Sequence, residues 1–309
     1  MRIFSLTILI SHLLIACTSQ ESAPEILSLS NGSVERIEAF PSDFVPPRNI
    51  DVWMPEDFSK EKKYAVLYMH DGQMLYDSTT TWNKQEWGVD EIMGQLLSAN
   101  QIRPTIVVGI WNTEFRHSEY FPQKPFESLD QALRDSLYAH TELFKTPVSS
   151  DNYLKFITKE LKPHIDQHYP TLSDPANTFV AGSSMGGLIS LYALCEYPEI
   201  FRGAACLSTH WVGTFDTLNN PIPAAFASYL EAHLPPAQDH RIYFDFGTET
   251  LDALYEPSQA QIDSIMVRKG YNAALWRTQK FPGANHSERA WRKRLGIPLG
   301  FLLGENFPE

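Results

Sequence analysis

The sequence predicts an α/β fold: one mostly parallel central sheet with antiparallel N-terminal strands and helices on both faces. Two observations predict it. Short apolar runs alternate with helical patterns along most of the chain, and the first two runs alternate apolar with polar residues. Such alternation is typical of half-exposed antiparallel strands, whereas the later, continuously apolar runs are typical of parallel strands covered on both faces. Strands and helices in alternation favour a single layered sheet.

Eight runs rich in Val, Ile, Phe and Tyr are expected to be strands, because these residues favour extended backbone. They span residues 34–40, 48–55, 64–71, 105–112, 178–184, 203–209, 241–247 and 274–281. Five further segments have apolar residues at helical spacing. The expected helices span residues 87–100, 149–169, 184–198, 257–270 and 288–304, and Pro163 is expected to kink or interrupt the second.

The chain is expected to divide into a leader, a tether and one domain. Residues 1–16 have a basic start and an apolar run, as in a secretory signal peptide, and the polar residues 17–33 predict a flexible tether. Residues 34–309 then form a single α/β domain. Within it, residues 113–148 form a long, aromatic insertion, which predicts either a lid over the site or a surface excursion held by its own aromatic side chains.

The leader ends in Leu-Ile-Ala-Cys, which resembles a bacterial lipobox. The resemblance implies cleavage before Cys17 and lipidation of its thiol. The protein would then cross the inner membrane and be lipid-anchored in the periplasm or at the cell surface. The alternative is an ordinary cleaved signal peptide. Cys195 and Cys206 lie in apolar segments and are expected to be buried free thiols, although an oxidising compartment would permit a disulfide.

The charge of the chain argues against a nucleic-acid partner. The formal net charge is −12, and the Lys and Arg residues form no stripe, whereas phosphate binding needs concentrated positive charge. No metal site is expected either. His164 and His168 stand four residues apart in a helical segment, but their stretch, HIDQH, lacks the adjacent His-Glu pair of zinc hydrolases.

Two adjacent serines stand in the stretch VAGSSMGG, and the spacing selects one of them. The nucleophile-elbow pattern G-x-S-x-G fits with Gly182 and Gly186 around Ser184, whereas Ser183 lacks glycines at this spacing. A strand pattern precedes the turn and a helix pattern follows it, as the motif requires. Ser184 is therefore the candidate nucleophile. The N–H of Met185, at the start of the helix, is a candidate oxyanion donor.

A serine hydroxyl needs a base to take its proton. His286 follows the last expected strand and precedes the final helix, which is where folds with this motif place the catalytic histidine. The carboxylate that orients the histidine should follow the preceding strand, where Glu249 and Asp252 both stand. Asp252 is preferred and Glu249 stays open as the alternative. Asp245, inside the strand, is expected to be structural.

The loop after the third strand, MHDGQMLYD, is expected to supply the second oxyanion donor. Gly72 lets the chain turn, which makes the N–H of Gln73 the candidate. We interpret His70 and Asp71 as residues that shape this loop, rather than as a metal site or a second acid–base pair.

Four segments, in their order along the chain, together resemble a known family: YAVLYMHDGQMLYD, AGSSMGGLISLYAL, YFDFGTETLD and FPGANHSERAWRKRL. Over residues 45–304 the chain is similar to the "putative esterase" family of α/β hydrolases. This family includes feruloyl and acetylxylan esterases, enterochelin-type siderophore esterases and mycolyl transferases. The resemblance implies the α/β-hydrolase fold.

The resemblance also implies roles for single residues. It implies Ser184 as nucleophile, His286 as base and the amides of Gln73 and Met185 as the oxyanion hole. In the family the acid often follows Gly-Thr after two or three residues, so the stretch GTETLD leaves Asp252 and Glu249 both open.

The expected function is hydrolysis of carboxylic esters through an acyl-enzyme, with no cofactor. The expected substrate is a small-molecule, saccharide or siderophore ester; an acyltransferase and a non-catalytic surface binding lipoprotein are the alternatives. Trp82, Trp87, His210 and Trp211 are candidate substrate-binding residues because aromatic side chains offer large contact area, with core packing as the alternative. The sequence leaves the natural ester and the oligomeric state open.

Overall fold

The computed structural model describes residues 27–140, 143–215 and 218–304. The expected signal peptide, Cys17 and the first part of the expected tether lie outside these ranges. Within them, no helix is both long and apolar enough to cross a membrane. The described residues also contain no group of three His, Cys, Asp or Glu side chains arranged to hold a metal ion.

The last part of the expected tether is docked on the fold. The backbone N–H of Ser28 donates to the Asp77 carboxylate (2.8 Å), and that of Ser30 donates to the Asp90 carboxylate (2.7 Å). Leu27 and Leu29 pack against the apolar core. From Leu27 onward the chain is therefore part of the domain rather than a free linker.

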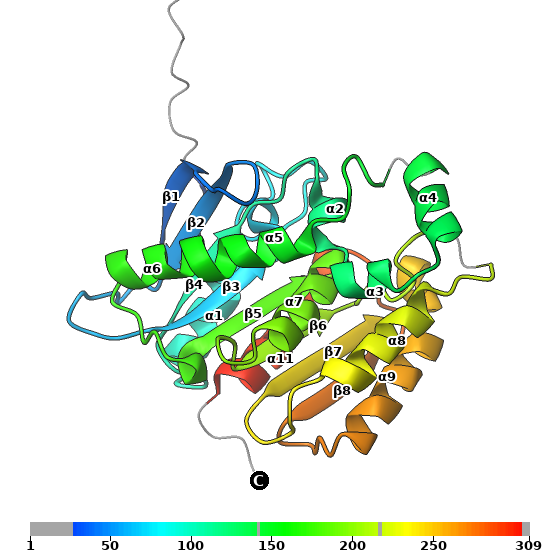
Figure 1. Cartoon of the computed structure of the whole chain (residues 1–309). Coiled ribbons are helices and arrows are strands. Elements are labelled where there is room, and N and C mark those ends of the chain that lie inside the picture. Colours follow the sequence, from blue (N-terminus) through cyan, green and yellow to red (C-terminus); the bar gives the residue numbers. More distant parts are fainter. Residues whose placement is uncertain (1–26, 141–142, 216–217, 305–309) are drawn as a thin grey trace, which may run out of the picture.

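A sheet of eight strands runs through the described part of the molecule (Figure 1). Its strand order is β1-β2-β4-β3-β5-β6-β7-β8. The β1–β2 and β2–β4 pairs are antiparallel and the other neighbours are parallel, which confirms the predicted fold class. The strands are β1 (Ser33–Phe40), β2 (Arg48–Met54), β3 (Ala65–His70), β4 (Thr105–Ile110), β5 (Thr178–Ser183), β6 (Gly203–Leu207), β7 (Arg241–Gly247) and β8 (Trp276–Phe281).

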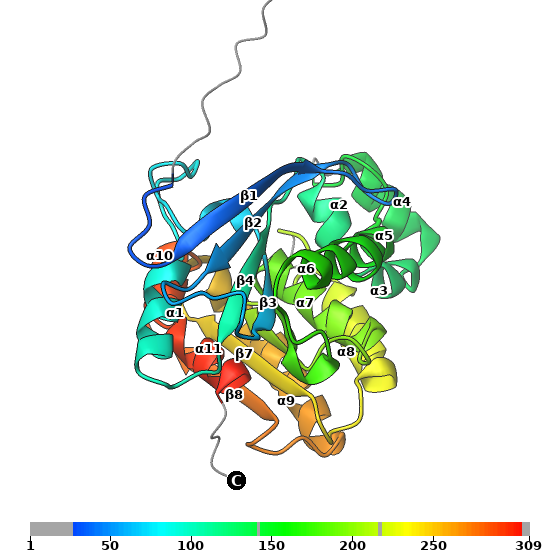
Figure 2. The same cartoon turned by 90° about the vertical axis from the view of Figure 1, so that its left-hand side faces the viewer.

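Helices cover both faces of this sheet (Figures 1 and 2). The longer helices are α1 (Val89–Ser98), α4 (Gln131–His140), α7 (Met185–Glu196), α8 (Ile222–His233), α9 (Glu256–Arg268) and α11 (Gly296–Leu303). The shorter ones are α2 (Arg116–Tyr120), α3 (Gln123–Glu127), α5 (Ser150–Lys155), α6 (Lys162–His168) and α10 (Glu288–Arg292). Three 3-10 turns and one π-helical turn complete the described elements. The 3-10 turns are η1 (Gly72–Met74), η3 (Pro175–Asn177) and η4 (Thr250–Leu254), and the π-helical turn is η2 (Phe156–Leu161).

The two faces of the sheet carry two separate apolar clusters. Along β3, Val66 and Tyr68 belong to the cluster beneath α7, α8 and α9, whereas Leu67 and Met69 belong to the cluster beneath α1 and α11. This alternation is what a strand buried on both faces requires. Cys195 and Cys206 are buried free thiols, as expected, and burial raises the pKa of both.

Two expected helices differ in detail. The interruption expected at Pro163 is a π-helical turn, Phe156–Leu161, which joins α5 to α6 just before the proline. A widened turn before a proline accommodates its ring and its missing N–H. The expected helix over residues 288–304 divides into α10 and α11.

The insertion over residues 113–148 contains α2, α3 and α4 (Figure 1). It also has its own aromatic cluster. The rings of Phe121, Phe126 and Phe144 lie 5.5–5.6 Å apart in pairs. This packing agrees with an excursion held by its own aromatic side chains. The first helix of the insertion, α2, also reaches the candidate active site. The role of the insertion as a lid stays a prediction.

Candidate active site

Ser184 lies in a sharp turn between β5 and α7. Its backbone has a φ of 57° and a ψ of −120°, a conformation that costs free energy for a residue other than glycine. The Ser184 N–H donates to the carbonyl of Leu207 (2.9 Å), and the Ser184 carbonyl accepts from the N–H of His210 (3.2 Å). A Cβ at Gly182 would lie 2.8 Å from the Gly186 carbonyl group, which explains the glycine there. The turn has the geometry of a nucleophile elbow.

His286 follows β8, and its imidazole meets one of the two candidate acids. His286 Nδ1 lies 2.5 Å from Oδ1 of Asp252, in the η4 turn after β7. Glu249 is exposed immediately before the same turn and has no side-chain hydrogen bond to the described residues. The structure therefore brings Asp252, and not Glu249, to His286.

The second oxygen of Asp252 is held by two neutral donors. Oδ2 accepts from the Ser208 hydroxyl (2.6 Å) and from the Gly247 N–H (2.6 Å). Burial alone would raise the pKa of Asp252, but hydrogen bonds from His286, Ser208 and Gly247 outweigh it and lower that pKa below its ordinary value. Asp252 is thus fully buried and ionised beside the imidazole.

Ser208 connects this carboxylate to a second buried ion pair. Its hydroxyl accepts from Trp291 Nε1 (2.9 Å) and from Arg294 Nη2 (2.9 Å) while donating to Asp252. One donated and two accepted hydrogen bonds use the full capacity of a hydroxyl group. Arg294 also donates to Asp245 (2.8 and 3.1 Å), so Asp245 has the structural part expected from its place inside β7.

Ser184 and His286 open onto one cavity of about 500 Å³. Its walls combine tryptophan rings with amide, hydroxyl and charged side chains. These include Trp82, Trp87, Trp291, Asn83, Gln85, Asn112, Arg116 and Glu288. Trp82 is 83% exposed at the rim, whereas Trp87 is buried with its ring 5.3 Å from that of Trp291. Both of these predicted substrate-binding tryptophans therefore border the space in front of the candidate nucleophile.

His210, a third predicted substrate-binding residue, lies behind Ser184 instead of in the cavity wall. The phenol of Tyr255, which is close to the Ser184 side chain, has its oxygen 2.8 Å from His210 Nδ1. Burial lowers the pKa of His210 to about 3, so its ring is neutral. The prediction is corrected because the chain after β6 turns inward, which places His210 in a buried hydrogen-bonded support.

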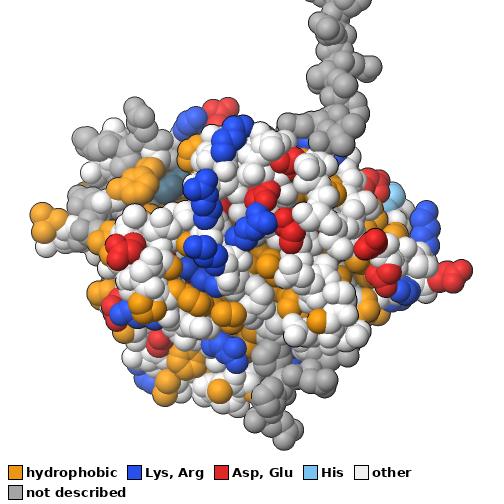
Figure 3. Space-filling model, turned by 180° about the vertical axis from the view of Figure 1, so that it is seen from behind, with side chains coloured by type: hydrophobic (Ala, Val, Ile, Leu, Met, Phe, Trp, Pro, Cys, Tyr) orange, Lys and Arg blue, Asp and Glu red, His pale blue; other side chains and the backbone are white. Residues whose placement is uncertain are grey.

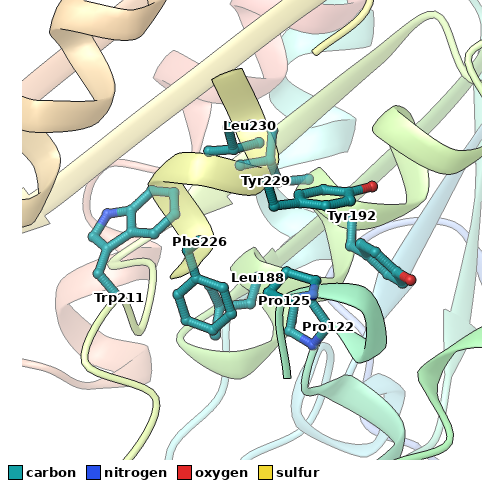
Figure 4. A pocket seen from close by; sticks show the side chains of 9 residues that line it. Pro122, Pro125, Leu188, Tyr192, Trp211, Phe226, Tyr229 and Leu230 are labelled. Atoms are coloured by element: carbon teal, nitrogen blue, oxygen red, sulfur yellow. The ribbon is translucent and has the colours of Figure 1, made fainter. Parts of the chain in front are cut away.

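Trp211 is also part of the core. Its indole N–H donates to Gln259 (2.9 Å), and its ring borders a small apolar cavity under α8 (Figure 4). The other rings and side chains around this cavity include Phe226, Tyr229 and Leu230. Its volume of about 10 Å³ holds no more than one water molecule. The alternative of core packing is therefore the one that describes Trp211.

The two expected oxyanion donors lie at the starts of two helical turns. Met185 is the first residue of α7, and Gln73 lies in η1, directly after β3. N–H groups at such positions have no partner inside their own helix, so they remain free to donate to a ligand. A Cβ at Gly72 would lie 2.6 Å from the Gly109 carbonyl carbon, which accounts for the glycine before Gln73.

An ion pair that sequence reasoning missed fixes the Gln73 loop. Asp71 has a left-handed backbone (φ 60°), and its carboxylate accepts from Arg116 Nε (2.6 Å) and Nη2 (2.7 Å). The Asn112 side chain donates to it as well (2.6 Å). Burial alone would raise the pKa of Asp71, but Arg116 and Asn112 lower it below its ordinary value. No local signal could have found this pair, because Arg116 lies in the insertion, far along the chain.

The imidazole of His70, next to the Asp71–Arg116 ion pair, is engaged in a structural contact. Its Nδ1 lies 2.9 Å from the Tyr153 hydroxyl, and burial lowers the pKa of His70 to about 3. A neutral imidazole inside a tyrosine contact agrees with a residue that shapes the loop. His164 and His168, the other pair considered, stack at 4.0 Å on α6.

A family model described as "Putative esterase" matches residues 44–300 of the chain. The chain is 24% identical over 269 residues to the uncharacterised protein YbbA of Bacillus subtilis, covering 84% of this chain and 94% of the relative. It is 28% identical over 187 residues to the carboxylesterase SOBER1 of Arabidopsis thaliana, covering 57% of this chain and 75% of the relative.

Solved structures of the same architecture include two named esterases. A ferulic acid esterase has a TM-score of 0.63 at 18% sequence identity, covering 88% of this chain and 98% of that one. The enterobactin esterase of Shigella flexneri has a TM-score of 0.61 at 18% identity, covering 89% of this chain and 60% of that one. At such identities the likeness shows the fold, which is that of the α/β hydrolases.

Proposed function

The chain belongs to the "Putative esterase" family, and from this premise we propose that it hydrolyses carboxylic esters through an acyl-enzyme formed on Ser184. The enzyme is a carboxylic ester hydrolase; the catalytic roles of its residues are our proposal. One observation carries it: His286, which is hydrogen-bonded to the buried Asp252, borders the same cavity as a serine held in an elbow turn.

Acylation begins when the Ser184 hydroxyl rotates from Tyr255 toward His286 Nε2. Apo structures often lack the tight catalytic hydrogen bond, which forms when substrate binds. Ser184 Oγ then attacks the ester carbonyl carbon while His286 takes the proton. Asp252 stabilises the imidazolium and holds its tautomer. The N–H groups of Gln73 and Met185 bind the oxyanion, and one such donor typically lowers the barrier by roughly 3–4 kcal/mol.

Collapse of the tetrahedral intermediate breaks the bond to the alcohol, which leaves with the proton held by His286. Water then enters, gives a proton to His286 and attacks the acyl carbon. The second intermediate releases the carboxylic acid, and the proton returns to Ser184. Neither acylation nor deacylation requires a redox cofactor.

Labelling with a fluorophosphonate probe tests the nucleophile. We expect the wild type and Ser183→Ala to be labelled and Ser184→Ala to be unlabelled, with hydrolysis of short-chain p-nitrophenyl esters lost in parallel. Ser183 is the matched control because it is the adjacent residue at the end of β5. Absence of labelling in the folded wild type would favour a non-catalytic binding protein.

Product analysis then separates hydrolysis from acyl transfer. With feruloyl, acetyl-xylan and siderophore esters, each given with an added alcohol acceptor, we expect free acid as the main product. Transfer of most of the acyl group to the acceptor would instead make the enzyme an acyltransferase.

We also propose that the protein is exported and anchored by lipid at Cys17. The support is the Leu-Ile-Ala-Cys stretch alone. Expression in a bacterium with radiolabelled palmitate should label the wild type, and Cys17→Ser should abolish the label. A secreted wild type without label would leave only an ordinary signal peptide.

A further inference from the structure

A second cavity adjoins the catalytic one. It has a volume of about 630 Å³ and shares Gln85 and Ser287 with the catalytic cavity. Its walls are the turn over residues 281–285, which precedes His286, and the segment over residues 287–297. We call this second cavity the basic groove.

The charged residues of the basic groove are all cationic. Arg289, Lys293 and Arg294 line it, and no carboxylate does, although the whole chain carries a formal charge of −12. Figure 3, which shows the face behind that of Figure 1, has Lys and Arg side chains near its middle, with Asp and Glu side chains among them. A local excess of positive charge in an acidic protein attracts anions to that place.

Two of these cations are left without a protein counter-ion. Arg289 and Lys293 are exposed, four residues apart, and neither forms an ion pair with any described residue. Arg292, between them, pairs instead with Glu86 and Glu91. The arrangement is consistent with a ligand that supplies the missing negative charge.

Arg294 lies deeper in the wall of the basic groove. It is only 3% exposed, and its Nε and Nη2 are bonded to Asp245 and Ser208. Its Nη1 is buried with no hydrogen-bond partner among the described residues, and its guanidinium lies over the Phe281 ring (4.8 Å). Arg289 and Lys293 are therefore the cations of the groove that a ligand can reach.

The position of the groove assigns it to one part of the ester. In the proposed mechanism His286 protonates the leaving alcohol, so the alcohol lies on the His286 side of the scissile bond. Asn285 and Ser287, the neighbours of His286, both line the groove. An alcohol leaving toward His286 would extend in that direction.

We propose that the basic groove binds an anionic group carried by the alcohol part of the substrate, so that the enzyme prefers esters of acidic alcohols such as acidic saccharides. The inference rests on the proposed ester hydrolysis. The groove recognises a carboxylate or a sulfate by the same charge-assisted hydrogen bonds.

Matched substrates test the proposal. The acetyl esters of methyl glucoside, of the methyl glycoside of glucuronic acid (free carboxylate) and of a sulfated methyl glucoside share the scissile bond and differ in charge. At low salt we expect kcat/KM to be roughly five- to tenfold higher for the anionic esters than for the neutral one. The preference should shrink as salt is added, because these side chains are exposed to screening. The ratio between the carboxylate and sulfate esters distinguishes the two sources of charge.

Variants locate the effect. Arg289→Gln with Lys293→Gln should bring the preference close to one and leave the neutral ester unchanged. Lys60→Gln with Lys63→Gln removes the same charge from exposed residues that precede the amino end of β3, whereas the groove follows the carboxyl end of β8, and should keep the preference. Equal kcat/KM for all three esters in a wild type that accepts the fluorophosphonate would overturn the groove alone. If the folded wild type is neither labelled by the fluorophosphonate nor able to hydrolyse any of the esters, the proposed function itself is overturned.

Discussion

Asp71 and Asp252 are both buried carboxylates that follow strands of the same sheet, one on each side of the catalytic cavity. Asp71 receives two charged hydrogen bonds from Arg116. Asp252 receives neutral hydrogen bonds from Ser208 and Gly247, and its nearest guanidinium nitrogen is 3.9 Å away. Arg116 neutralises the charge of Asp71, whereas the charge of Asp252 remains available to stabilise the His286 imidazolium.

The chemistry explains the difference. A Cβ at Gly186 would lie 3.5 Å from Asp71 Oδ2, so this carboxylate stands beside the first turn of α7, where the oxyanion is expected. An uncompensated negative charge there would oppose the developing oxyanion, and Arg116 removes that opposition. Asp252 faces the opposite demand, because His286 becomes positive in the transition state. The same residue type is therefore held by charged donors in one place and neutral donors in the other.

The largest effect is expected when the negative charge of Asp252, beside the His286 imidazole, is removed. Asp252→Asn should lower kcat by about 10⁴-fold, because the amide neither stabilises an imidazolium nor holds the required tautomer. Glu249→Gln, in the same turn, should stay within about twofold of the wild type, since its side chain is exposed. Steady-state kinetics on a p-nitrophenyl ester measure both. A larger loss in Glu249→Gln would reverse the assignment of the acid.

The next largest effect is expected when Arg116 is removed, because the negative charge of Asp71 is then no longer neutralised beside the oxyanion. Arg116→Met should lower kcat by about 10- to 100-fold, since Asp71 then opposes the oxyanion at short range. Asp71→Asn in the Arg116→Met background should recover at least half of that loss on a logarithmic scale.

A double-mutant cycle over Asp71 and Arg116 checks this coupling, with the melting temperature of each variant measured beside kcat. If Asp71→Asn recovers the melting temperature and leaves kcat low, the pair serves the fold and not the oxyanion.

A smaller effect weakens the neutral support of Asp252. Ser208→Ala leaves one lone pair of Asp252 without its donor, so kcat/KM should fall by about tenfold. The Ser208 hydroxyl helps to lower the pKa of Asp252, so its removal raises that pKa. Activity needs the ionised carboxylate, and the acidic limb of the pH profile should therefore move to higher pH. A uniform loss at every pH would point to a disturbed fold instead.

The smallest effect concerns a third buried carboxylate, which has neither an Arg nor an imidazole. Burial, together with the neighbouring Glu91, raises the pKa of Asp90 to about 6 despite the N–H of Ser30. A raised pKa gives stability below the unfolded value near 3.8 that is lost as the pH rises through about 6. Asp90→Asn should raise the melting temperature by a few degrees at pH 7 and leave it unchanged at pH 3. Calorimetry at the two pH values measures it, and equal shifts at both would contradict the argument.

The sequence predicted the parts of the site that short patterns encode. The spacing of Gly182, Ser184 and Gly186 selected the serine, and the order of strands along the chain selected His286. It left two acids open, because Glu249 and Asp252 follow the same strand and only the direction of the η4 turn separates them.

Contacts between distant segments were beyond the sequence. The insertion over residues 113–148 has no periodicity that would pair Arg116 with Asp71. Aromatic residues line cavity walls and also fill cores, and a sequence does not distinguish the two cases. His210 and Trp211 were therefore grouped with Trp82 and Trp87. The position of the catalytic cavity, which depends on the whole fold, separated them: Trp82 and Trp87 line it, whereas His210 and Trp211 do not.

We expect position 208 to tolerate little variation in evolution. Its φ of 42° disfavours the β-branched threonine, and glycine, which tolerates that backbone, brings no hydroxyl. A homologue with another residue at this place must therefore support its acid by different atoms. Such a lineage would be recognised by coordinated changes at the positions of Trp291 and Arg294, which would lose their shared acceptor.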